Sequence, residues 1–470
     1  MHGLRNGDIA AALPDIRQTA RFDDIEQADE HMAMAFALLD QQDLTAVTEV
    51  CARVIETQPS WHMPYFLMGL ALHGRGERRA AIDMFLQCAQ RNPYFEVAYE
   101  NAAQICLATG LRGRALEIAL QMERFVPGHA DNRFRIGSLY LLDEDYEAAK
   151  HYFDAGLNSP VPQRLSRMLA FGTLSLPRLL HDERQIDHLL QRGLLDDEFL
   201  SVRRAYQHAL GEYPAARAKA ASSADGDWEV PENVLSRLTR FYRRTVHLQP
   251  CPRIASEAIN PELDIDAVVA DFHDQPEPLN YAVIDDLLSP EALDGLLDYL
   301  NSSTIWHNDS QRGRNYIGAY RDMGLMCPLM DQVIEELQAR FAPIVGNLCL
   351  REIWAYRLVT GATAIGAHAD FSETNINIWL APDSANNVAG TGGLTLYEAS
   401  CPPDWSFEDY NDDETKIAEI IGDARKIEIP YRQNRAIVFN AAMFHASQPT
   451  HFVDAYEANR INLTFLFGQR

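Results

Sequence analysis

The stretch Ala367-His368-Ala369-Asp370, followed by Asn375-Ile376-Asn377-Ile378-Trp379-Leu380, sets an imidazole and a carboxylate just ahead of a segment with strand character. Successive side chains of an extended chain point to opposite faces, so His368 and Asp370 share a face. A second imidazole from elsewhere in the chain would complete a set of two histidines and one carboxylate. Such a set leaves coordination positions open and suits non-haem Fe(II).

Around this stretch, short segments of strand character are separated by turns containing Gly, Pro, Asn and Asp. They cover residues 279–284, 352–359, 376–380, 393–397, 425–429, 435–439 and 460–467. Two helices are expected among the earlier residues, one beginning at Ser289-Pro290 with Ser as N-cap and one over 330–341. Helices followed by many short strands favour a double-stranded β-helix (jelly roll) with flanking helices.

The first half of the chain shows a repeat. Pro59, Pro93 and Pro127 are spaced 34 residues apart, and the small residues Ala81 and Ala115 keep the same step. Helix pairs need small residues where they cross and a proline where the second helix stops. The period resembles that of the tetratricopeptide repeat and predicts an α-solenoid with units at 28–61, 62–95, 96–129 and 130–162.

Three parts are therefore expected: a helical repeat domain over 28–220, a linker over 221–277 and a β-rich domain over 278–470. Stacked helix pairs leave a concave face that commonly binds a protein or peptide. A role in holding the chain together or in dimerisation is the alternative for this array.

Composition narrows the function classes. The 470 residues carry a formal net charge of -26, which disfavours a grip on nucleic-acid phosphates. Seven scattered cysteines without a CxxC pair are typical of a reducing compartment. Neither a secretory signal nor a long apolar run is present in the sequence. We therefore expect a cytoplasmic protein that binds neither nucleic acid nor membrane.

The β-rich part resembles the Fe(II)/2-oxoglutarate-dependent oxygenases over roughly 278–470, most closely the prolyl-hydroxylase-type branch. Its last strand is also similar to that of the nucleic-acid demethylase branch. The segments that carry the resemblance are Thr360-Gly361, His368-Ala369-Asp370, Asn375 to Leu380, Gly392-Gly393-Leu394-Thr395-Leu396-Tyr397, Arg435-Ala436-Ile437-Val438-Phe439, His445-Ala446-Ser447-Gln448-Pro449 and Arg460-Ile461-Asn462-Leu463-Thr464-Phe465.

The resemblance implies a metal triad of His368, Asp370 and His445, with His451 as the competing third ligand. It implies Arg460 as the partner of the distal carboxylate of 2-oxoglutarate, which a guanidinium matches bidentately. A structural ion pair is the other interpretation of Arg460.

Three more residues are candidates on the cofactor side. Tyr356 could add a hydroxyl to the same carboxylate, or could simply belong to the core. Asn375 and Asn377 share a strand face and could line the cofactor site, or could serve turns and backbone.

The implied cofactors are Fe(II), 2-oxoglutarate and O2, and the implied reaction is hydroxylation of a C–H bond. A protein or peptide recruited by the repeats is the first substrate hypothesis, and a small-molecule metabolite is its rival. A scaffold with an inactive barrel is the non-enzymatic alternative. Two segments keep open roles: 306–321 as a lid or a solvated loop, and the acidic 401–423 as a guide for a basic substrate or a solvated excursion.

Overall fold

The computed structural model describes residues 22–159, 173–220, 228–229, 238–309, 316–359 and 365–469. The chain divides into two compact units, residues 1–136 and 137–470. In the described ranges no helix is both long enough and apolar enough to cross a membrane. The seven cysteines form no disulfide, and six of them are buried. Thr360-Gly361 lies outside the described residues.

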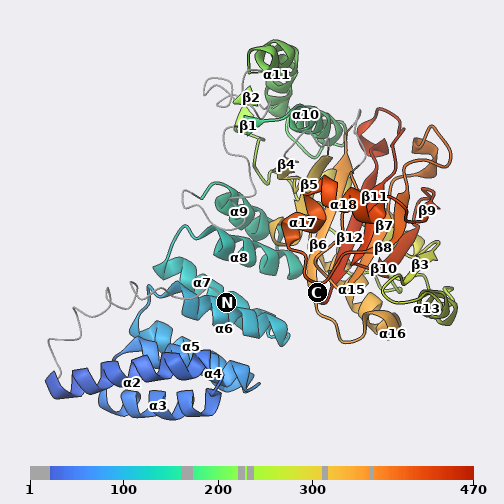
Figure 1. The fold of residues 1–470 in the computed structure, drawn as a ribbon. Helices are drawn as coiled ribbons and strands as arrows, with labels where there is room; N and C mark the ends of the chain where they lie inside the picture. The colour runs from blue at the N-terminus through green and yellow to red at the C-terminus, as the bar shows by residue number, and fades with distance from the viewer. Residues whose placement is uncertain are drawn as a thin grey trace. The chain divides into compact units, whose positions relative to one another are not determined.

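The first unit consists of antiparallel helix pairs (Figure 1). Its helices are α2 (Phe22–Asp40), α3 (Leu44–Thr57), α4 (His62–Gly74), α5 (Arg78–Arg91), α6 (Glu96–Ala108), α7 (Arg112–Phe125) and the start of α8 (Ala130–Leu142). The first helices of successive pairs begin 34 residues apart, at His62 and Glu96. Pro59 and Pro93 each stand two residues beyond the end of a second helix. The prediction of a helical repeat is therefore confirmed.

Small residues in the repeat make room for aromatic rings. A Cβ on Gly69 would lie 2.7 Å from the ring of Phe85, which is fully buried on the neighbouring helix. The same contact recurs within the second unit, where a Cβ on Gly137 would lie 2.8 Å from the ring of Phe153. Both pairs are 16 positions apart and differ by two repeat periods. The periodic small residues are thus explained by close helix packing.

Replacing Gly69 with Ala is expected to destabilise the chain by about 1–2 kcal/mol, because the added methyl group overpacks a core whose ring cannot move aside. Gly113 offers a matched control, since it is an exposed helical glycine with no atom near its would-be Cβ. Gly113→Ala is expected to stabilise by about 0.5–1 kcal/mol through helix propensity alone. Urea unfolding of both variants, followed by far-ultraviolet circular dichroism, measures the difference. Equal effects of the two substitutions would contradict the packing argument.

The second unit contains helices and antiparallel sheets. Its helices after α8 are α9 (Tyr146–Leu157), α10 (Leu176–Gln191), α11 (Phe199–Ala220), α13 (Ile265–His273), α14 (Pro290–Ser302), α15 (Pro328–Arg340), α16 (Ala342–Val345), α17 (Phe407–Asn411) and α18 (Glu414–Ile421). α14 begins as predicted, with Pro290 in its first turn and the Ser289 hydroxyl accepting from the Ala292 amide. A two-stranded ribbon, β1 (Thr173–Leu174) with β2 (Trp228–Glu229), was not predicted.

One sheet has seven strands, in the order β3-β10-β7-β12-β6-β5-β4, and another has three, in the order β11-β8-β9 (Figure 1). The strands are β3 (Tyr281–Ile284), β4 (Asn308–Asp309), β5 (Tyr316–Tyr320), β6 (Leu350–Leu358), β7 (Thr374–Trp379), β8 (Leu394–Ser400), β9 (Lys426–Ile429), β10 (Ala436–Asn440), β11 (Met443–Ser447) and β12 (Ile461–Phe467). The predicted strands are all present within three residues of their expected bounds. β4, β5 and β11 were missed.

The two sheets pack against each other through apolar side chains. Trp379, Ile437 and Phe439 of the large sheet share a buried cluster with Leu396 and Met443 of the small sheet. Burial on this scale is the main favourable term for such a layer structure. An antiparallel-sheet region in the C-terminal part is therefore confirmed.

The segment expected to be a linker, 221–277, is described at residues 228–229, which form β2, and from residue 238 onward. It carries α13, and Ile259 forms a bridge with Leu288 just ahead of α14. The Ile259 amide also donates to the Glu336 carboxylate of α15 over 2.8 Å. This part of the segment therefore belongs to the packed second unit.

A buried polar cluster ties α10 to the start of the large sheet. Arg178 pairs with Asp182 over 3.1 Å and donates to the carbonyl of Trp306. His181 bonds to the Asp182 carboxylate over 3.0 Å, and His307 lies within 3.3 Å of the Thr245 hydroxyl. Both imidazoles are fully buried, and burial, more than any neighbouring charge, lowers the pKa of His181 to about 4 and that of His307 to about 3.

These two histidines are expected to make stability depend on pH. In the unfolded chain each imidazole has a pKa of about 6.5. Below that pH the unfolded state therefore binds protons that the folded state does not bind. The free energy of unfolding should fall as pH drops from about 6.5 toward 4, by about 1.4 kcal/mol per pH unit for each group. Urea unfolding at pH 7, 6 and 5 measures this slope. His181→Gln should reduce it, whereas the same change at the exposed His208 should not.

Candidate metal centre

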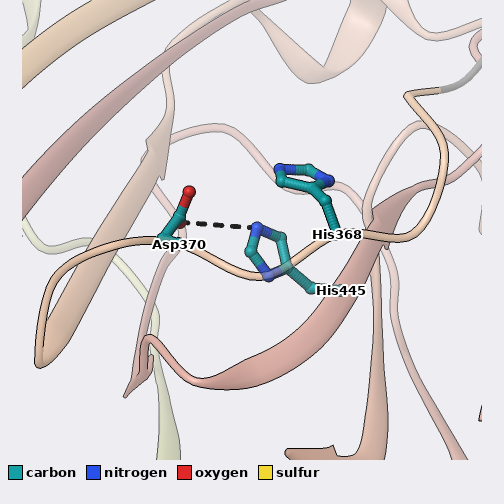
Figure 2. A group of neighbouring side chains, drawn as sticks. All are labelled: His368, Asp370 and His445. Atoms are coloured by element: carbon teal, nitrogen blue, oxygen red, sulfur yellow. Dashed lines mark ion pairs between the residues drawn. The ribbon is translucent and has the colours of Figure 1, made fainter. Parts of the chain in front are cut away.

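Backbone pairing brings His368 and His445 side by side. The His368 amide donates to the His445 carbonyl over 3.0 Å, and the His445 amide donates back over 2.9 Å. One step along, the Asp370 amide donates to the Ala441 carbonyl over 2.9 Å. His368 and Asp370 lie outside the named strands but in locally extended chain, so they share the face expected of i and i+2. Figure 2 shows all three side chains converging on one point.

The triad is compact and mostly buried. One ligand atom from each of His368, Asp370 and His445 lies within 4.8 Å of the others. Nε2 of His445 is 3.6 Å from Oδ2 of Asp370, and the two imidazole centroids are 4.3 Å apart. Asp370 and His445 are buried, whereas His368 is half-buried. Among the described residues this is the group of histidine, cysteine and carboxylate side chains that is close enough to hold a metal.

Neighbouring atoms orient the ligands. Nδ1 of His368 lies 2.9 Å from the Gly366 carbonyl and Nδ1 of His445 lies 3.1 Å from the Met443 carbonyl. A carbonyl oxygen only accepts, so each Nδ1 carries the proton and each Nε2 keeps a free lone pair. The Asn375 amide donates to one oxygen of Asp370. Such second contacts fix the tautomer and angle of metal ligands.

Burial also sets the charge state of His445. Together with the nearby His368 it lowers the pKa of His445 to about 4, against the raising effect of Asp370. The imidazole is therefore neutral at neutral pH. A neutral imidazole is the form that binds a metal, so no proton has to leave His445 before a metal binds.

The triad lines a cavity of about 400 Å³. Its walls come from both sheets and from the 401–423 segment. The polar neutral side chains of its lining, called the polar wall, are Asn375, Asn377, Ser447, Asn462 and Thr464. The aromatic rings of its lining, called the aromatic wall, are Tyr316, Tyr320, Trp354, Tyr356, Phe371 and Phe407.

Arg460 adjoins the polar wall but lines a separate cavity of about 390 Å³. It precedes β12 and shares a strand face with Asn462 and Thr464, and its Nη1 donates to the Asn462 side-chain oxygen over 3.3 Å. Nε donates to the Gly392 carbonyl over 2.6 Å. The guanidinium lies 5.6 Å from the ring of Trp379, within cation–π range.

Arg460 is almost completely buried, and no described carboxylate lies within ion-pair distance of it. Burial lowers its pKa to about 10, although the nearby Tyr431 has the opposite effect. The interpretation of Arg460 as half of a structural ion pair therefore finds no partner in the described parts of the chain.

The other predicted residues are placed as follows. The hydroxyl of Tyr356 lies 3.2 Å from that of Tyr320, in the aromatic wall. The amide of Asn377 donates to the Thr464 hydroxyl over 2.9 Å. The side-chain oxygens of Asn375 and Asn377 are buried without a partner, which marks unused polar capacity in the cavity wall.

His451 is separate from the triad. It is exposed and lines that separate cavity of about 390 Å³, together with Arg460, Phe452 and Asn387. Of the two histidines that the sequence offered as third ligand, the structure brings His445 to His368 and Asp370.

Two segments with open roles also have definite places. In the 306–321 segment, Trp306 and His307 are buried and Tyr316–Tyr320 forms β5, while Arg312 and Arg314 lie outside the described residues. The lid interpretation is therefore not supported for its described part. The 401–423 segment folds into α17 and α18, and the Tyr410 carbonyl accepts from the Ala369 amide, between two triad residues.

Sequence reasoning missed the aromatic wall. Tyr316 and Tyr320 belong to an unpredicted strand, and Phe371 and Phe407 stand in loop-like sequence. The i, i+2 spacing of Tyr316, Gly318 and Tyr320 was the available signal. A Cβ on Gly318 would lie 3.2 Å from the Tyr356 ring, so the glycine makes room for that ring between the two tyrosines.

No protein-family model and no curated protein matches the sequence. Solved structures with a similar chain trace include MamA, 19% identical over 28% of this chain and 77% of that one, with a TM-score of 0.26. MamA from Desulfovibrio magneticus RS-1, from residue 41 to the end, is 13% identical over 40% of this chain and 96% of that one, with a TM-score of 0.26.

The epimerase SnoN from nogalamycin biosynthesis is a third such structure. In complex with Fe3+, alpha-ketoglutarate and nogalamycin RO, it is 13% identical over 44% of this chain and 83% of that one, with a TM-score of 0.34. Scores of this size carry no inference about the site of this chain.

Proposed function

We propose that the chain is an Fe(II)- and 2-oxoglutarate-dependent oxygenase that hydroxylates a C–H bond. One observation carries the proposal: a preoriented triad of two histidines and a carboxylate lines a cavity whose Asn462 accepts a hydrogen bond from Arg460, a buried arginine with no carboxylate partner among the described residues. The triad matches a non-haem iron site with open positions. The arginine matches the far end of a dicarboxylate cofactor.

The donor set fits Fe(II). His368 and His445 each hold Nδ1 against a backbone carbonyl and leave Nε2 for a metal, and Asp370 supplies a carboxylate oxygen. The Asn375 amide and the two Nδ1 contacts hold these ligands in place before any metal arrives. Three protein ligands on one side leave the other side for a keto-acid and oxygen.

Arg460 fits the distal carboxylate of 2-oxoglutarate. A buried cation without a counter-charge is costly, and a bound carboxylate would relieve that cost. Asn377, Thr464 and Asn462 line the polar wall between the triad and Arg460. They offer hydrogen bonds along the length of the cofactor. Lysine at position 460 would lack the bidentate geometry.

When bound, iron with 2-oxoglutarate and O2 supplies the oxidising chemistry, in which 2-oxoglutarate is decarboxylated to succinate and a substrate C–H bond is hydroxylated. The chain's own residues bind and orient the cofactor and the substrate. The polar wall holds the cofactor, and the aromatic wall places the substrate and keeps water from the triad.

The finer architecture belongs to the same proposal. We infer that the two sheets form a jelly roll, that the helix pairs are tetratricopeptide-like, and that the domains are bounded at 28–220 and 278–470. The repeats would deliver a protein or peptide to the cavity, with a small-molecule metabolite as the rival substrate. The 34-residue step of the helices supports the repeat assignment.

The test is turnover of the cofactor itself. Purified chain with Fe(II), 2-oxoglutarate and O2 is expected to release succinate slowly without substrate, and omission of Fe(II) should stop the release. Failure to take up Fe(II) or to bind 2-oxoglutarate would contradict the proposal. That outcome would favour the scaffold interpretation instead.

A further inference from the structure

The aromatic wall of the cavity is built by two neighbouring strands at one end of the large sheet. Tyr316 and Tyr320 of β5 flank the ring of Tyr356 on β6, with ring centroids 4.4 Å and 6.3 Å from it. Trp354 stacks on Tyr356 at 5.8 Å, and Phe371 lies 6.4 Å from Trp354. All five rings are half-buried and line the cavity.

Carboxylates accompany these rings. Asp322 follows β5 and Glu352 lies on β6, two positions before Trp354, and both line the cavity. Among the described lining residues there is neither a lysine nor an arginine. The wall therefore combines electron-rich ring faces with negative charge, beside a triad that adds the carboxylate of Asp370.

We propose that this aromatic and acidic face of the cavity recognises a cationic group of the substrate, an ammonium or a guanidinium. The assignment rests on the proposed oxygenase function and names its substrate class. Tryptophan and tyrosine faces attract cations through the ring quadrupole, and nearby carboxylates add Coulomb attraction. An anionic substrate would meet repulsion from the same groups.

The charge of the loaded site points the same way. Fe(II) contributes two positive charges and Arg460 one, whereas Asp370 contributes one negative charge and 2-oxoglutarate two, so these groups cancel on simple counting. The carboxylates of Asp322 and Glu352 then set the sign of the field in the cavity. A cationic group is thus favoured before and after the cofactor binds.

Two sources could present such a group: the side chain of a lysine or arginine in a peptide, or a free amine metabolite. Both carry the cationic group that the cavity would recognise. Phe407 of α17 lies on the cavity wall while half of its surface is exposed, so the wall reaches the protein surface where either source could enter.

Direct binding tests the inference without turnover. Calorimetry on the full-length chain compares N-acetyl-arginine amide with N-acetyl-citrulline amide, which has nearly the same shape and no charge. N-acetyl-lysine amide and N-acetyl-norleucine amide form the second pair. At least one cationic member is expected to bind about 10-fold or more tightly than its neutral partner. Equal or tighter binding of both neutral members, or no binding by any member, would overturn the inference.

Variants locate the binding. Asp322→Asn, Glu352→Gln and Trp354→Leu should each weaken binding of the cation by about 5-fold or more, and Glu408→Gln, on α17 outside the cavity lining, should not. Weakening by the control alone would overturn the assignment. Free L-arginine and a nine-residue peptide that contains arginine then distinguish the two sources. The one that stimulates succinate release identifies the source.

The failure of this inference can be told from failure of the proposed function. Substrate-free succinate release by the unchanged chain, which Glu408→Gln should match, tests the oxygenase without any cation. Release with no cation preference would refute the cationic substrate and leave the oxygenase intact. Cation binding without any cofactor turnover would refute the oxygenase and leave the binding face intact.

Discussion

Replacing His445 with Ala is expected to lower Fe(II) affinity by at least about 100-fold, because loss of a ligand outweighs the 10- to 100-fold cost of losing a mere supporting contact. Two ligand atoms from His368 and Asp370 would remain, too few for a stable site. The measurement is anaerobic Fe(II) titration, followed through a metal-dependent absorption or by calorimetry, together with succinate release.

His451→Ala is the matched control, since this histidine is exposed and stands away from the triad. It should leave Fe(II) affinity unchanged. Metal loss in His451→Ala with retention in His445→Ala would contradict the assignment of the third ligand. Because His445 is buried, circular dichroism of the variant must first show that the fold is kept.

Replacing Arg460 with Met is expected to weaken 2-oxoglutarate binding by about 100-fold or more, since a buried carboxylate left without its partner costs about 3–5 kcal/mol. Arg460→Lys should recover only part of the loss, because an ammonium keeps the charge without the bidentate fork. Calorimetric titration of 2-oxoglutarate into the Fe(II)-loaded chain measures both variants.

Stability separates this role from a structural one. In the free protein Arg460 is a buried cation without a carboxylate partner, so removing its charge should leave the melting temperature nearly unchanged or higher. Arg435 is a useful comparison, because it pairs with Asp285 over 2.6 Å at the start of β10. Arg435→Met should lower stability without changing 2-oxoglutarate affinity. A marked drop in melting temperature for Arg460→Met with unchanged affinity would assign it to the fold.

Much of the fold could be predicted from local sequence patterns. The 34-residue step depends on contacts between neighbours in sequence, such as Gly69 against Phe85, so periodicity alone exposed it. The strands from 350 to 467 had alternating or apolar runs bounded by turn residues, which are equally local signals. The triad was accessible for a related reason: His368 and Asp370 are two residues apart, and their partner follows a recognisable strand.

Long-range placement was much less accessible. β5 follows a segment rich in Arg, Gly and Asn and is only five residues long, so its own tyrosines gave a weak signal, and its pairing with β6 is a long-range contact. Tyr356, a candidate for the cofactor carboxylate or for the core, contacts Tyr320 of that unpredicted strand. Trp379 and Tyr431 around Arg460 likewise come together only through the stacking of sheets.

The paired amides of His368 and His445 have a consequence for the dynamics of the site. Each of these two residues donates a backbone hydrogen bond to the other, and the Asp370 amide adds a third bond beside them. We therefore expect the backbone hydrogen bonds of the three ligand residues to break together. Amide hydrogen exchange at positions 368, 370 and 445 should therefore report a single local opening event, and bound metal should slow it as one unit. Bound metal would shift this local opening equilibrium further toward the closed state, which the backbone hydrogen bonds already favour.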